Sequence, residues 1–504
     1  MKGIAIGLSN NSKEILKRLK KTEFVKDIYI AGSSKEDGKE NELIQVQKPR
    51  EILLKKWPKI DLIIFIGSIA ASIRIINPFL TSKDQDPGVI VIDNKCSKIV
   101  PLIGLHQSNT QNISCQIANL LGGEIIETNN SNDQSLLNLD AFGNQWGWKR
   151  SGKINDWSKL VIKQAKNEEI FCKQLSGNSL WKTSESAEII NQIDKKETEK
   201  PDSTFHVSIF ENHGTTWHPP VLWIGIGCER NTSKELIANS LNNLLESGNL
   251  SQQSIAGFAT IDIKKDEKGI LELSEEKNLP IKFFSKKDLS TIIVPNPSNV
   301  VQKEIGTPSV AEASCLLAAG EESKLLEEKR IFKNQSGAVT IAVAESKNQY
   351  NPTHGEIHII GSGPGDISFL TNNARKALSR CTVWIGYKMY LDLIKPLKRN
   401  DQVLIESKLT EEKERCSKAI KLAEEGIKVA LISSGESGFY GMAGLLLELL
   451  QKIKKEYRPY FEVHPGISSV QLAAAISGAP LMNDFCSVSL SDKLTPWSLI
   501  EKRI

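Results

Sequence analysis

Short runs of apolar, β-branched residues alternate with longer helical stretches along most of the 504-residue chain, and this pattern predicts an α/β protein of several three-layer domains. A second set of such runs begins at Val221 and ends near Ala344, and a third begins at Gly355. The rule of roughly 100 to 200 residues per domain gives about three domains for this length. The clearest runs in the first third of the chain are residues 4–8, 28–31, 62–66 and 89–92.

Changes in composition locate the expected domain boundaries. From Lys166 to Pro220 charged and polar residues replace the apolar runs, so this part is expected to be a partly ordered connector. The predicted plan is an N-terminal α/β domain over 1–150, the connector over 151–220, a second α/β domain over 221–345, a polar linker over 346–354, a third α/β domain over 355–490, and the start of a further domain over 491–504.

Charge and cysteine content exclude some classes of function. The 64 basic and 60 acidic residues nearly balance, so the net charge of +4 gives no nucleic-acid footprint. The eight cysteines include no C-x-x-C pair, and neither a zinc site nor a redox dithiol is expected. His213 and His218 flank a short segment but lack further ligands, so no metal site is predicted.

The N-terminus enters a strand-like run directly, without a cleavable signal pattern, which favours a cytoplasmic protein. The segment from Leu62 to Leu80 is apolar, but it contains Gly67, Arg74 and Pro78. A strand, a glycine turn and a short helix explain this segment better than a membrane span. No membrane association is therefore expected.

The glycine-rich loop after the apolar run 355–360 is the strongest chemical signal. Gly361, Gly363 and Gly365 permit backbone angles closed to other residues and let a ligand approach the main chain, while Pro364 fixes the turn. A dinucleotide fingerprint would require its third glycine where Asp366 stands. A carboxylate suits a cation or a hydroxyl-rich ligand better than a pyrophosphate, so a nucleotide-dependent oxidoreductase is the weaker interpretation.

This loop and several later segments resemble the tetrapyrrole methylases of cobalamin synthesis, and most closely precorrin-3B C(17)-methyltransferase. The resemblance implies S-adenosylmethionine as the methyl donor and a tetrapyrrole, either a precorrin or a cobalt-precorrin, as the substrate. It implies donor contacts at the loop residues and at Pro364, Ser434, Gly435, Glu436 and Phe439. Glu436 stands where the family more often has aspartate. The matching segments are residues 361–366, 385–394, 433–444, 464–469, 478–485 and 489–497.

The middle of the chain resembles the cobalt-precorrin-5A hydrolases, which open a lactone on the corrin precursor. The first domain is similar to the N-terminal part of that family through Phe65 to Gly67, Arg74 and Asp86-Pro87, but it departs at 104–109, where only His106 remains. The matching segments in the middle domain are residues 225–233, 259–262, 294–298 and 306–313.

His106 and Glu312 are the candidate catalytic residues of this hydrolase-like region. Glu312 could activate the water that attacks the lactone, because a general base must be a carboxylate or a histidine within reach of that water. His106 could act as an acid or base, since its ordinary pKa lies near neutral pH. A loop histidine and a solvated helix carboxylate are the structural alternatives, and both remain open.

Two expected helix starts have a similar double interpretation. The run from Thr232 to Glu235 has the spacing of a capping box, and Thr307-Pro308 suits a cap and a first helical turn. These residues could serve the helices alone. Alternatively, two exposed helix N-termini could hold the carboxylates of an acidic substrate.

Together these features predict a fused corrinoid-pathway enzyme with a hydrolase-like front and a methyltransferase-like back, expected to be a homo-oligomer. In the resembling methyltransferases a second domain follows the point near Trp497, so the chain ending at Ile504 is expected to lack it. A corrinoid-binding scaffold that has lost both activities, or one half of a split enzyme, is the alternative.

Overall fold

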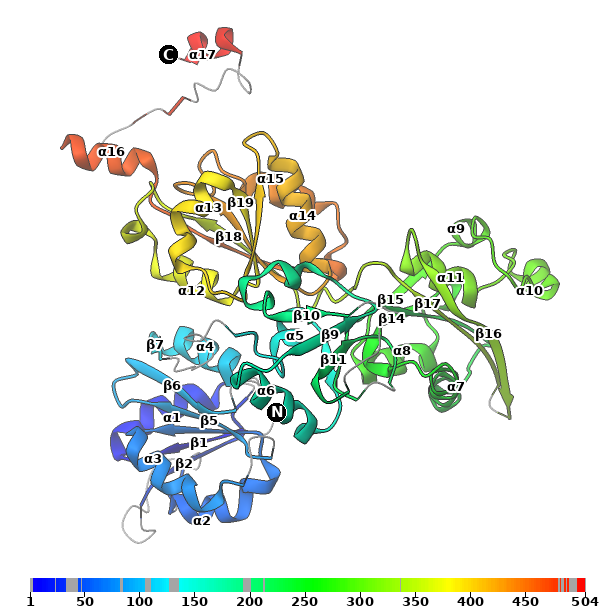
Figure 1. Ribbon diagram of the computed structural model, residues 1–504, viewed down its shortest axis with the longest axis horizontal. Helices are drawn as coiled ribbons and strands as arrows, with labels where there is room; N and C mark the ends of the chain where they lie inside the picture. Colours follow the sequence, from blue (N-terminus) through cyan, green and yellow to red (C-terminus); the bar gives the residue numbers. More distant parts are fainter. Residues whose placement is uncertain are drawn as a thin grey trace. The chain divides into compact units, whose positions relative to one another are not determined.

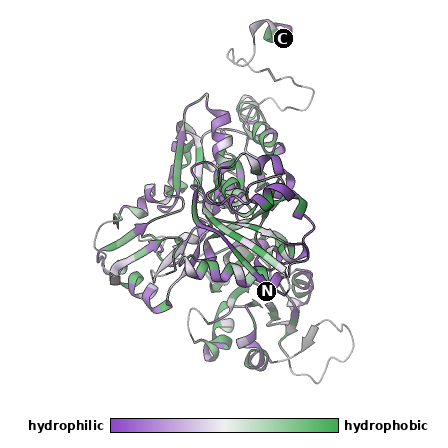
Figure 2. Ribbon diagram, turned by 90° about the vertical axis from the view of Figure 1, so that its right-hand side faces the viewer, coloured by the Kyte–Doolittle hydropathy of each residue, from purple (hydrophilic) through white to green (hydrophobic). Residues whose placement is uncertain are grey.

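The computed structural model describes residues 3–22, 24–32, 44–46, 48–81, 85–104, 110–126, 136–193, 201–211, 214–335, 337–478, 481, 485, 487–488 and 496–503. The chain divides into two compact units, Met1–Asp133 and Gln134–Ile504 (Figure 1). The first unit therefore ends before the boundary expected near residue 150. The sheets are built largely from hydrophobic residues, while the helices carry both hydrophobic and hydrophilic ones (Figure 2).

The first unit contains a seven-stranded sheet in the order β3-β2-β1-β4-β5-β6-β7. Its strands pair in parallel except for β5 and β6. Helices α1 and α4 share one apolar core with the sheet, and α2 and α3 share another, which gives three layers. The elements are β1 (Gly3–Gly7), α1 (Lys13–Lys20), β2 (Asp27–Ile30), β3 (Ile44–Val46), α2 (Pro49–Lys56), β4 (Leu62–Ile66), α3 (Ile69–Ile76), β5 (Gly88–Ile92), β6 (Lys98–Ile103), α4 (Thr110–Leu121) and β7 (Glu124–Ile125).

The apolar segment from Leu62 to Leu80 is divided as the sequence predicts. Strand β4 ends at Ile66, Gly67 makes the turn, and Ser68 caps α3 by accepting a hydrogen bond from Ala71 N. Among the described residues, none of the helices has the length and apolarity that crossing a membrane requires.

Residues 142–218 form a folded domain with a five-stranded sheet in the order β10-β9-β11-β12-β8. The expectation of a partly ordered connector over 151–220 is therefore wrong. The cause lies in the core, which uses a few large aromatic side chains, among them Trp157, Phe205 and Trp217, in place of long aliphatic runs. The elements are α5 (Phe142–Gln145), β8 (Lys149–Ser151), α6 (Ile154–Ala165), β9 (Ile170–Gln174), β10 (Ile190–Gln192), β11 (Thr204–Val207) and β12 (Thr216–His218).

The middle domain has a sheet in the order β15-β14-β13-β17-β16, in which β16 and β17 form an antiparallel hairpin. The apolar stretch from Leu222 to Ile226 is buried at its centre. The elements are β13 (Leu222–Cys228), α7 (Lys234–Ser247), β14 (Ile255–Ile261), α8 (Lys268–Lys277), β15 (Ile281–Phe284), α9 (Lys286–Ser290), α10 (Asn299–Glu304), α11 (Ala311–Ala319), β16 (Lys324–Asn334) and β17 (Gly337–Glu345).

The last sheet is entirely parallel, in the order β20-β19-β21-β18-β22. Helices α12 and α13 cover one face, and α14 and α15 cover the other (Figure 1). The elements are β18 (Glu356–Gly361), α12 (Asn372–Arg380), β19 (Val383–Tyr387), α13 (Lys388–Ile394), β20 (Val403–Ser407), α14 (Glu412–Glu424), β21 (Lys428–Ser433), α15 (Ala443–Gln451), β22 (Tyr460–His464), α16 (Ser469–Ser477) and α17 (Trp497–Arg503).

The chain order of this sheet creates a topological switch point between β18 and β21. The connection from β18 runs through α12 on one face, whereas the connection from β21 runs through α15 on the other. In open parallel sheets, ligands bind beyond the carboxyl ends of the two strands at such a point. The glycine loop predicted from the sequence follows β18 at this position.

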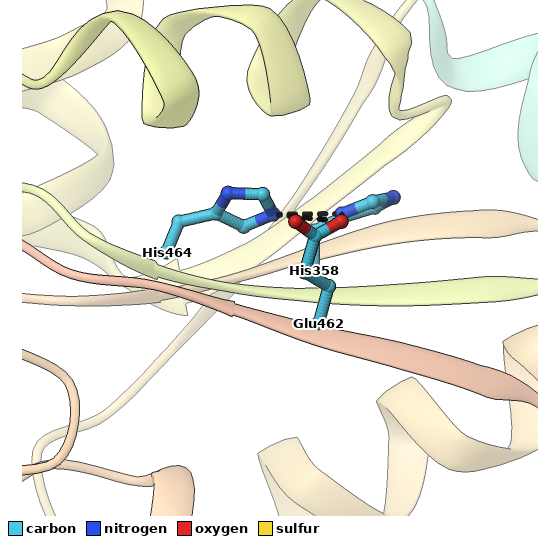
Figure 3. A group of neighbouring side chains, drawn as sticks. All are labelled: His358, Glu462 and His464. Atoms are coloured by element: carbon cyan, nitrogen blue, oxygen red, sulfur yellow. Dashed lines mark hydrogen bonds and ion pairs between the residues drawn. The ribbon is translucent and has the colours of Figure 1, made fainter. Parts of the chain in front are cut away.

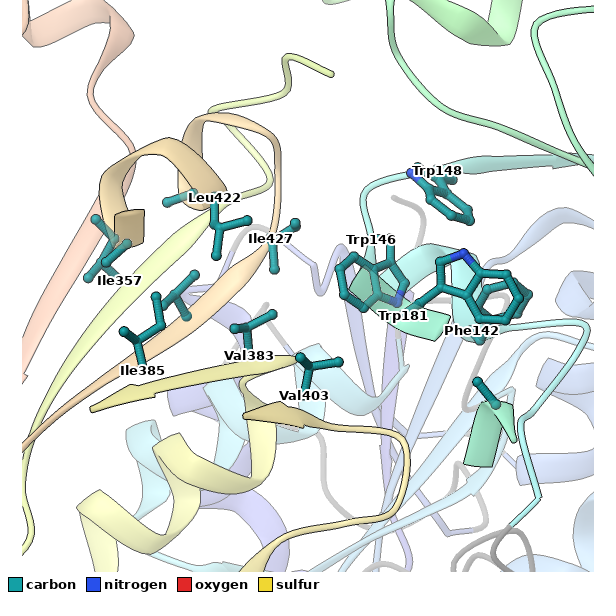
Figure 4. Packing of buried hydrophobic residues seen from close by; sticks show 14 of the residues in the cluster. Phe142, Trp146, Trp148, Trp181, Ile357, Val383, Ile385, Val403, Leu422 and Ile427 are labelled. Carbon is teal, nitrogen blue, oxygen red and sulfur yellow. The ribbon is translucent and has the colours of Figure 1, made fainter. Parts of the chain in front are cut away.

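The domain of residues 142–218, called the aromatic domain from here on, shares one hydrophobic core with the last sheet. Trp146, Trp148 and Trp181 belong to the same buried cluster as Val383 and Ile427 (Figure 4). Polar contacts edge this core: Gln145 Nε2 donates to Asp401 Oδ2 at 2.9 Å, and Lys398 pairs with Glu185 at 3.2 Å. Residues 142–218 are therefore packed as part of the methylase-like half of the chain.

Gln349 joins the two parts of this core. Its side-chain nitrogen donates to the carbonyl oxygens of Trp146 at 2.6 Å and Glu425 at 2.7 Å, and its oxygen accepts from Trp148 Nε1 at 2.8 Å. The side chain is buried, although its segment was expected to be a polar linker. Its amide group provides hydrogen-bond partners for buried groups, so the polar side chain at this position does not indicate exposure to solvent.

Replacing Gln349 with alanine should lower the free energy of unfolding by about 2 to 4 kcal/mol, because several buried polar groups lose their partner at once. Equilibrium denaturation of the whole chain measures this effect. The matched control is Asn348→Ala, which truncates the exposed amide next to it and should change little. Equal stability of the two variants would contradict the bridging role of Gln349.

Candidate functional site

The glycine loop lies where the backbones of β18 and β21 converge. Gly363 and Gly435 form an antiparallel bridge, with Gly363 N donating to Gly435 O at 3.1 Å and Gly435 N donating to Gly363 O at 2.8 Å. Both residues have positive φ angles, of 78° and 61°. Residues other than glycine rarely adopt these angles, so the backbone conformation of the turn requires glycine at both positions.

A third glycine, Gly466, lies two residues beyond the end of β22 and closes this arrangement. A Cβ atom at Gly466 would lie 2.0 Å from the carbonyl oxygen of Gly435 and 2.6 Å from that of Gly361. A Cβ atom at Gly361 would lie 2.6 Å from Gly466 N. The three backbones are therefore in direct contact, and no side chain fits between them.

Asp366 and Glu436 bond to their own turns. Asp366 caps the short 3-10 helix Ile367–Phe369 by accepting from Ser368 N at 2.7 Å, and this hydrogen bond lowers the pKa of its carboxyl. Glu436 Oε2 accepts from Gly438 N at 2.7 Å. Both carboxylates thus hold the loops in shape, a local role that the resemblance did not indicate.

The other predicted donor contacts surround the same edge of the sheet. Ser434 and Phe439 are exposed, and Pro364 is half-buried. A Cβ atom at Gly365 would meet no atom of the described residues within 4 Å, so open space adjoins the loop. The buried Ser437 hydroxyl has no hydrogen-bond partner among the described residues. Ser437 was not predicted, although it lies inside the motif 433–444.

An open pocket of about 630 Å³ lies at the carboxyl ends of the neighbouring strands β19 and β20. Tyr387, Met389 and Leu409 give it apolar walls. Lys388 and Glu406 pair across it at 3.0 Å. The lining includes part of the motif 385–394, so this motif contributes to a surface beside the glycine loop.

The middle domain corrects both predicted caps. Ser233 caps α7 by accepting from Leu236 N, and Thr232 instead donates its hydroxyl to Glu229 O. Helix α11 begins at Ala311, beyond Thr307 and Pro308. Thr307 is buried and its hydroxyl bonds to Ser309 O. The capping-box spacing was misleading because the helix begins one residue later than the motif implies.

Glu312 is fully buried in the first turn of α11, so it is not a solvated helix carboxylate. Its Oε1 atom accepts from Asn296 Nδ2 at 3.0 Å and from Lys329 N at 3.2 Å. Its Oε2 atom has no partner among the described residues. Asn296, which lies in the motif 294–298, therefore positions this carboxylate, and the sequence alone did not indicate that pairing.

The histidine predictions have separate outcomes. His106 and His213 lie outside the described residues. His218 is buried, with Nε2 bonded to Ser151 Oγ at 2.7 Å and Nδ1 to Ser208 O at 2.8 Å. Both of its nitrogens have protein partners, so His218 holds the aromatic domain together and has no free lone pair for a metal.

Cys228 is the last residue of β13, and burial raises the pKa of its thiol to about 11, which favours the neutral thiol over the nucleophilic thiolate.

Three family models match the chain in separate segments. Residues 51–132 match the cobalamin synthesis G N-terminal model, and residues 222–344 match the cobalamin synthesis G C-terminus. Residues 356–504 match the tetrapyrrole (corrin/porphyrin) methylases. The chain joins a cobalamin synthesis G region to a tetrapyrrole methylase region. The aromatic domain, residues 142–218, lies between the first and second of these matches along the chain and outside all three.

Individual relatives agree with this division. A probable cobalt-factor III C(17)-methyltransferase of Salmonella typhimurium is 48% identical over 148 residues, which are 29% of this chain and 60% of that protein. A precorrin-3B C(17)-methyltransferase of Sinorhizobium is 34% identical over 30% of this chain and 59% of its own length. A cobalt-precorrin-5A hydrolase of Priestia megaterium is 27% identical over 67% of this chain and 93% of its own length. The chain thus spans about 60% of either methyltransferase and nearly all of the hydrolase.

Gly466→Ala should lower the free energy of unfolding by about 1 to 3 kcal/mol, the usual effect of forcing an extra carbon into a closed contact. Gly444→Ala is the matched control. A Cβ atom there meets nothing within 4 Å and Gly444 lies in α15, so alanine should be neutral or stabilising. Thermal and denaturant unfolding of both variants measure the difference. Equal effects would show that the glycine contact is not tight.

Proposed function

We propose that the chain is a bifunctional enzyme of cobalamin synthesis. Its methylase region transfers a methyl group from S-adenosylmethionine to ring carbon 17 of a corrin precursor, and its front region opens the lactone of a cobalt-precorrin-5A-type substrate. The observation that carries the proposal is the glycine-lined edge at the β18/β21 switch point, within the segment matched by the methylase model.

The residues at this edge fit a donor that binds against the main chain. Gly363 and Gly435 keep side chains away from the turn, and the open space beside Gly365 leaves room for a ligand. The unpartnered Ser437 hydroxyl offers a polar contact. S-adenosylmethionine supplies an activated methyl group on a sulfonium leaving group. The protein therefore chiefly aligns the two reactants, an effect worth roughly 7 to 11 kcal/mol.

The substrate of the methyl transfer is proposed to contain cobalt already. The relative named for cobalt-factor III is 48% identical, whereas the one named for precorrin-3B is 34% identical. The open pocket beside the donor loop, with Met389 and Leu409 on its walls, would receive one edge of the flat macrocycle. Lys388 at its rim would face the peripheral carboxylates of the substrate.

The front region is proposed to open the lactone with Glu312 as general base and His106 as an acid or base. The buried Oε2 atom of Glu312 is an acceptor without a partner in the described part of the chain, which suits a bound water. Asn296 and Lys329 hold the other oxygen and fix the direction of the carboxylate. The N-termini of α7, capped by Ser233, and of α11, which begins at Ala311, take the place of the predicted starts at Thr232 and Thr307 as the proposed contacts for substrate carboxylates.

Gly363→Val should abolish binding of the methyl donor. A β-branched side chain at a φ of 78° strains the turn and reaches into the space next to Phe369. Calorimetric titration with S-adenosylhomocysteine measures the affinity, and circular dichroism verifies the fold. Gly444→Ala serves as the control with unchanged affinity. A folded Gly363→Val variant that binds like the parent would remove this loop from the donor site.

Glu312→Gln should slow lactone opening by about 10²- to 10⁴-fold, the usual contribution of a positioned proton carrier, and His106→Ala should act in the same range. Release of acetaldehyde from cobalt-precorrin-5A measures the rate. Glu328→Gln is the matched control. The exposed Glu328 carboxylate accepts a hydrogen bond from the same Asn296 side chain, at 2.7 Å, but it is not proposed to act in catalysis. If Glu312→Gln and His106→Ala both open the lactone at the rate of the parent, these residues have structural roles only. No release from the parent would favour a scaffold.

A further inference from the structure

A group of two imidazoles and one carboxylate lies on the α12 face of the methylase-like sheet. His358 on β18 pairs in register with Glu462 on β22, and Ile360 pairs with His464. Since alternate residues of a strand share a face, His358, Glu462 and His464 all point to the same side. Their ring nitrogens and carboxylate converge above the two strands (Figure 3).

The distances between the three ligand atoms suit a metal ion. His358 Nδ1 lies 2.9 Å from His464 Nε2, and Glu462 Oε2 lies 3.9 Å from the first and 3.8 Å from the second. The point equidistant from the corners of such a triangle lies about 2.1 Å from each corner, which is the usual bond length from Zn²⁺ to nitrogen and oxygen ligands.

A carboxylate behind the cluster fixes the tautomer of His358. Glu356 Oε2 lies 2.9 Å from His358 Nε2, and Glu356 itself pairs with Lys428 at 2.6 Å and with Arg380 at 3.4 Å. A carboxylate accepts here, so Nε2 carries the proton and Nδ1 presents its lone pair to the cluster. A ligating histidine that donates its other N–H to a carboxylate is the common arrangement around protein-bound zinc.

We propose that His358, Glu462 and His464 bind one divalent transition-metal ion of the zinc type. Two imidazoles exclude Mg²⁺ and Ca²⁺ as preferred ions, because those ions favour oxygen ligands. The histidines are buried, whereas the Glu462 side chain is 46% exposed and provides an entry path and a side open to water. When neutral His464 binds the ion through Nε2, its proton moves to Nδ1, so no net proton is released.

Such an ion would fasten β22 to the sheet. Strand β22 is an edge strand whose Tyr460 is exposed, and β18 is its only neighbour in the described sheet. His464 stands two residues before Gly466, whose backbone contacts Gly361 and Gly435. The ion would thereby hold the strand that carries the third glycine of the donor edge. This role does not depend on the identity of the methylated substrate.

Titration calorimetry of the chelator-treated whole chain with Zn²⁺ tests the proposal. The parent should bind one ion at this site, and Zn²⁺ should raise its melting temperature, since a ligand of the native state stabilises it by mass action. Glu356→Gln should weaken binding by roughly 10- to 100-fold, and loss of a direct ligand in Glu462→Gln or His464→Ala should weaken it at least as much. Glu456→Gln, which removes an exposed carboxylate shortly before β22, should bind like the parent.

A spectrum with Co²⁺ separates this site from the cysteines. Nitrogen and oxygen ligands give d–d bands without thiolate charge-transfer bands, and the d–d bands should be lost in Glu462→Gln. Because Glu462 is exposed, this variant should remain folded even if His464→Ala does not. Unchanged Zn²⁺ affinity in Glu462→Gln, thiolate bands in the parent, or no saturable binding by the parent would each overturn the proposal.

Discussion

The main-chain contact among Gly361, Gly435 and Gly466 is the constraint on which the glycine-lined edge of the methylase-like sheet depends. Three strands end at this contact, and no side chain separates them. The loops that follow therefore leave from fixed points, and the turns of Asp366 and Glu436 are built on these points. A single added carbon here would displace the glycine loop, the turn after β21 and the end of β22 together.

Local patterns in the sequence predicted much of the architecture. The glycine loop, the strand before it and the division of the Leu62–Leu80 segment follow from rules that act within a few residues. Asp366 shows the limit of such rules. Its position suggested a contact with the ligand, but its carboxylate accepts a hydrogen bond from the backbone N–H of Ser368 instead. The resemblance indicated this segment without showing which of its atoms remain available to a ligand.

Features that depend on contacts between distant segments could not be predicted. The aromatic domain was misinterpreted because its strands are short and its core residues are widely spaced among polar ones. Gln349 was expected to lie in an exposed polar linker, but its side chain forms hydrogen bonds with residues about 200 positions earlier. His358 and His464 are 106 residues apart, and only the parallel pairing of β18 with β22 brings them together. No spacing of residues along the sequence predicts that these two histidines are in contact.

The middle domain is fastened to the methylase-like domain by contacts of the same long-range kind. Lys282 on β15 lies over Trp223 at 4.1 Å and over Tyr350 at 4.5 Å, and burial lowers its pKa to about 8. Next to it, Ile281 O accepts a hydrogen bond from Tyr457 of the methylase-like domain at 3.1 Å. The Lys282 ammonium lies against both aromatic faces and donates a hydrogen bond to Ala318 O at 3.2 Å, so it links these side chains to α11. The segment from Ser346 to Tyr350 therefore joins three sheets as packed structure, and the two proposed activities are carried by domains that share buried contacts.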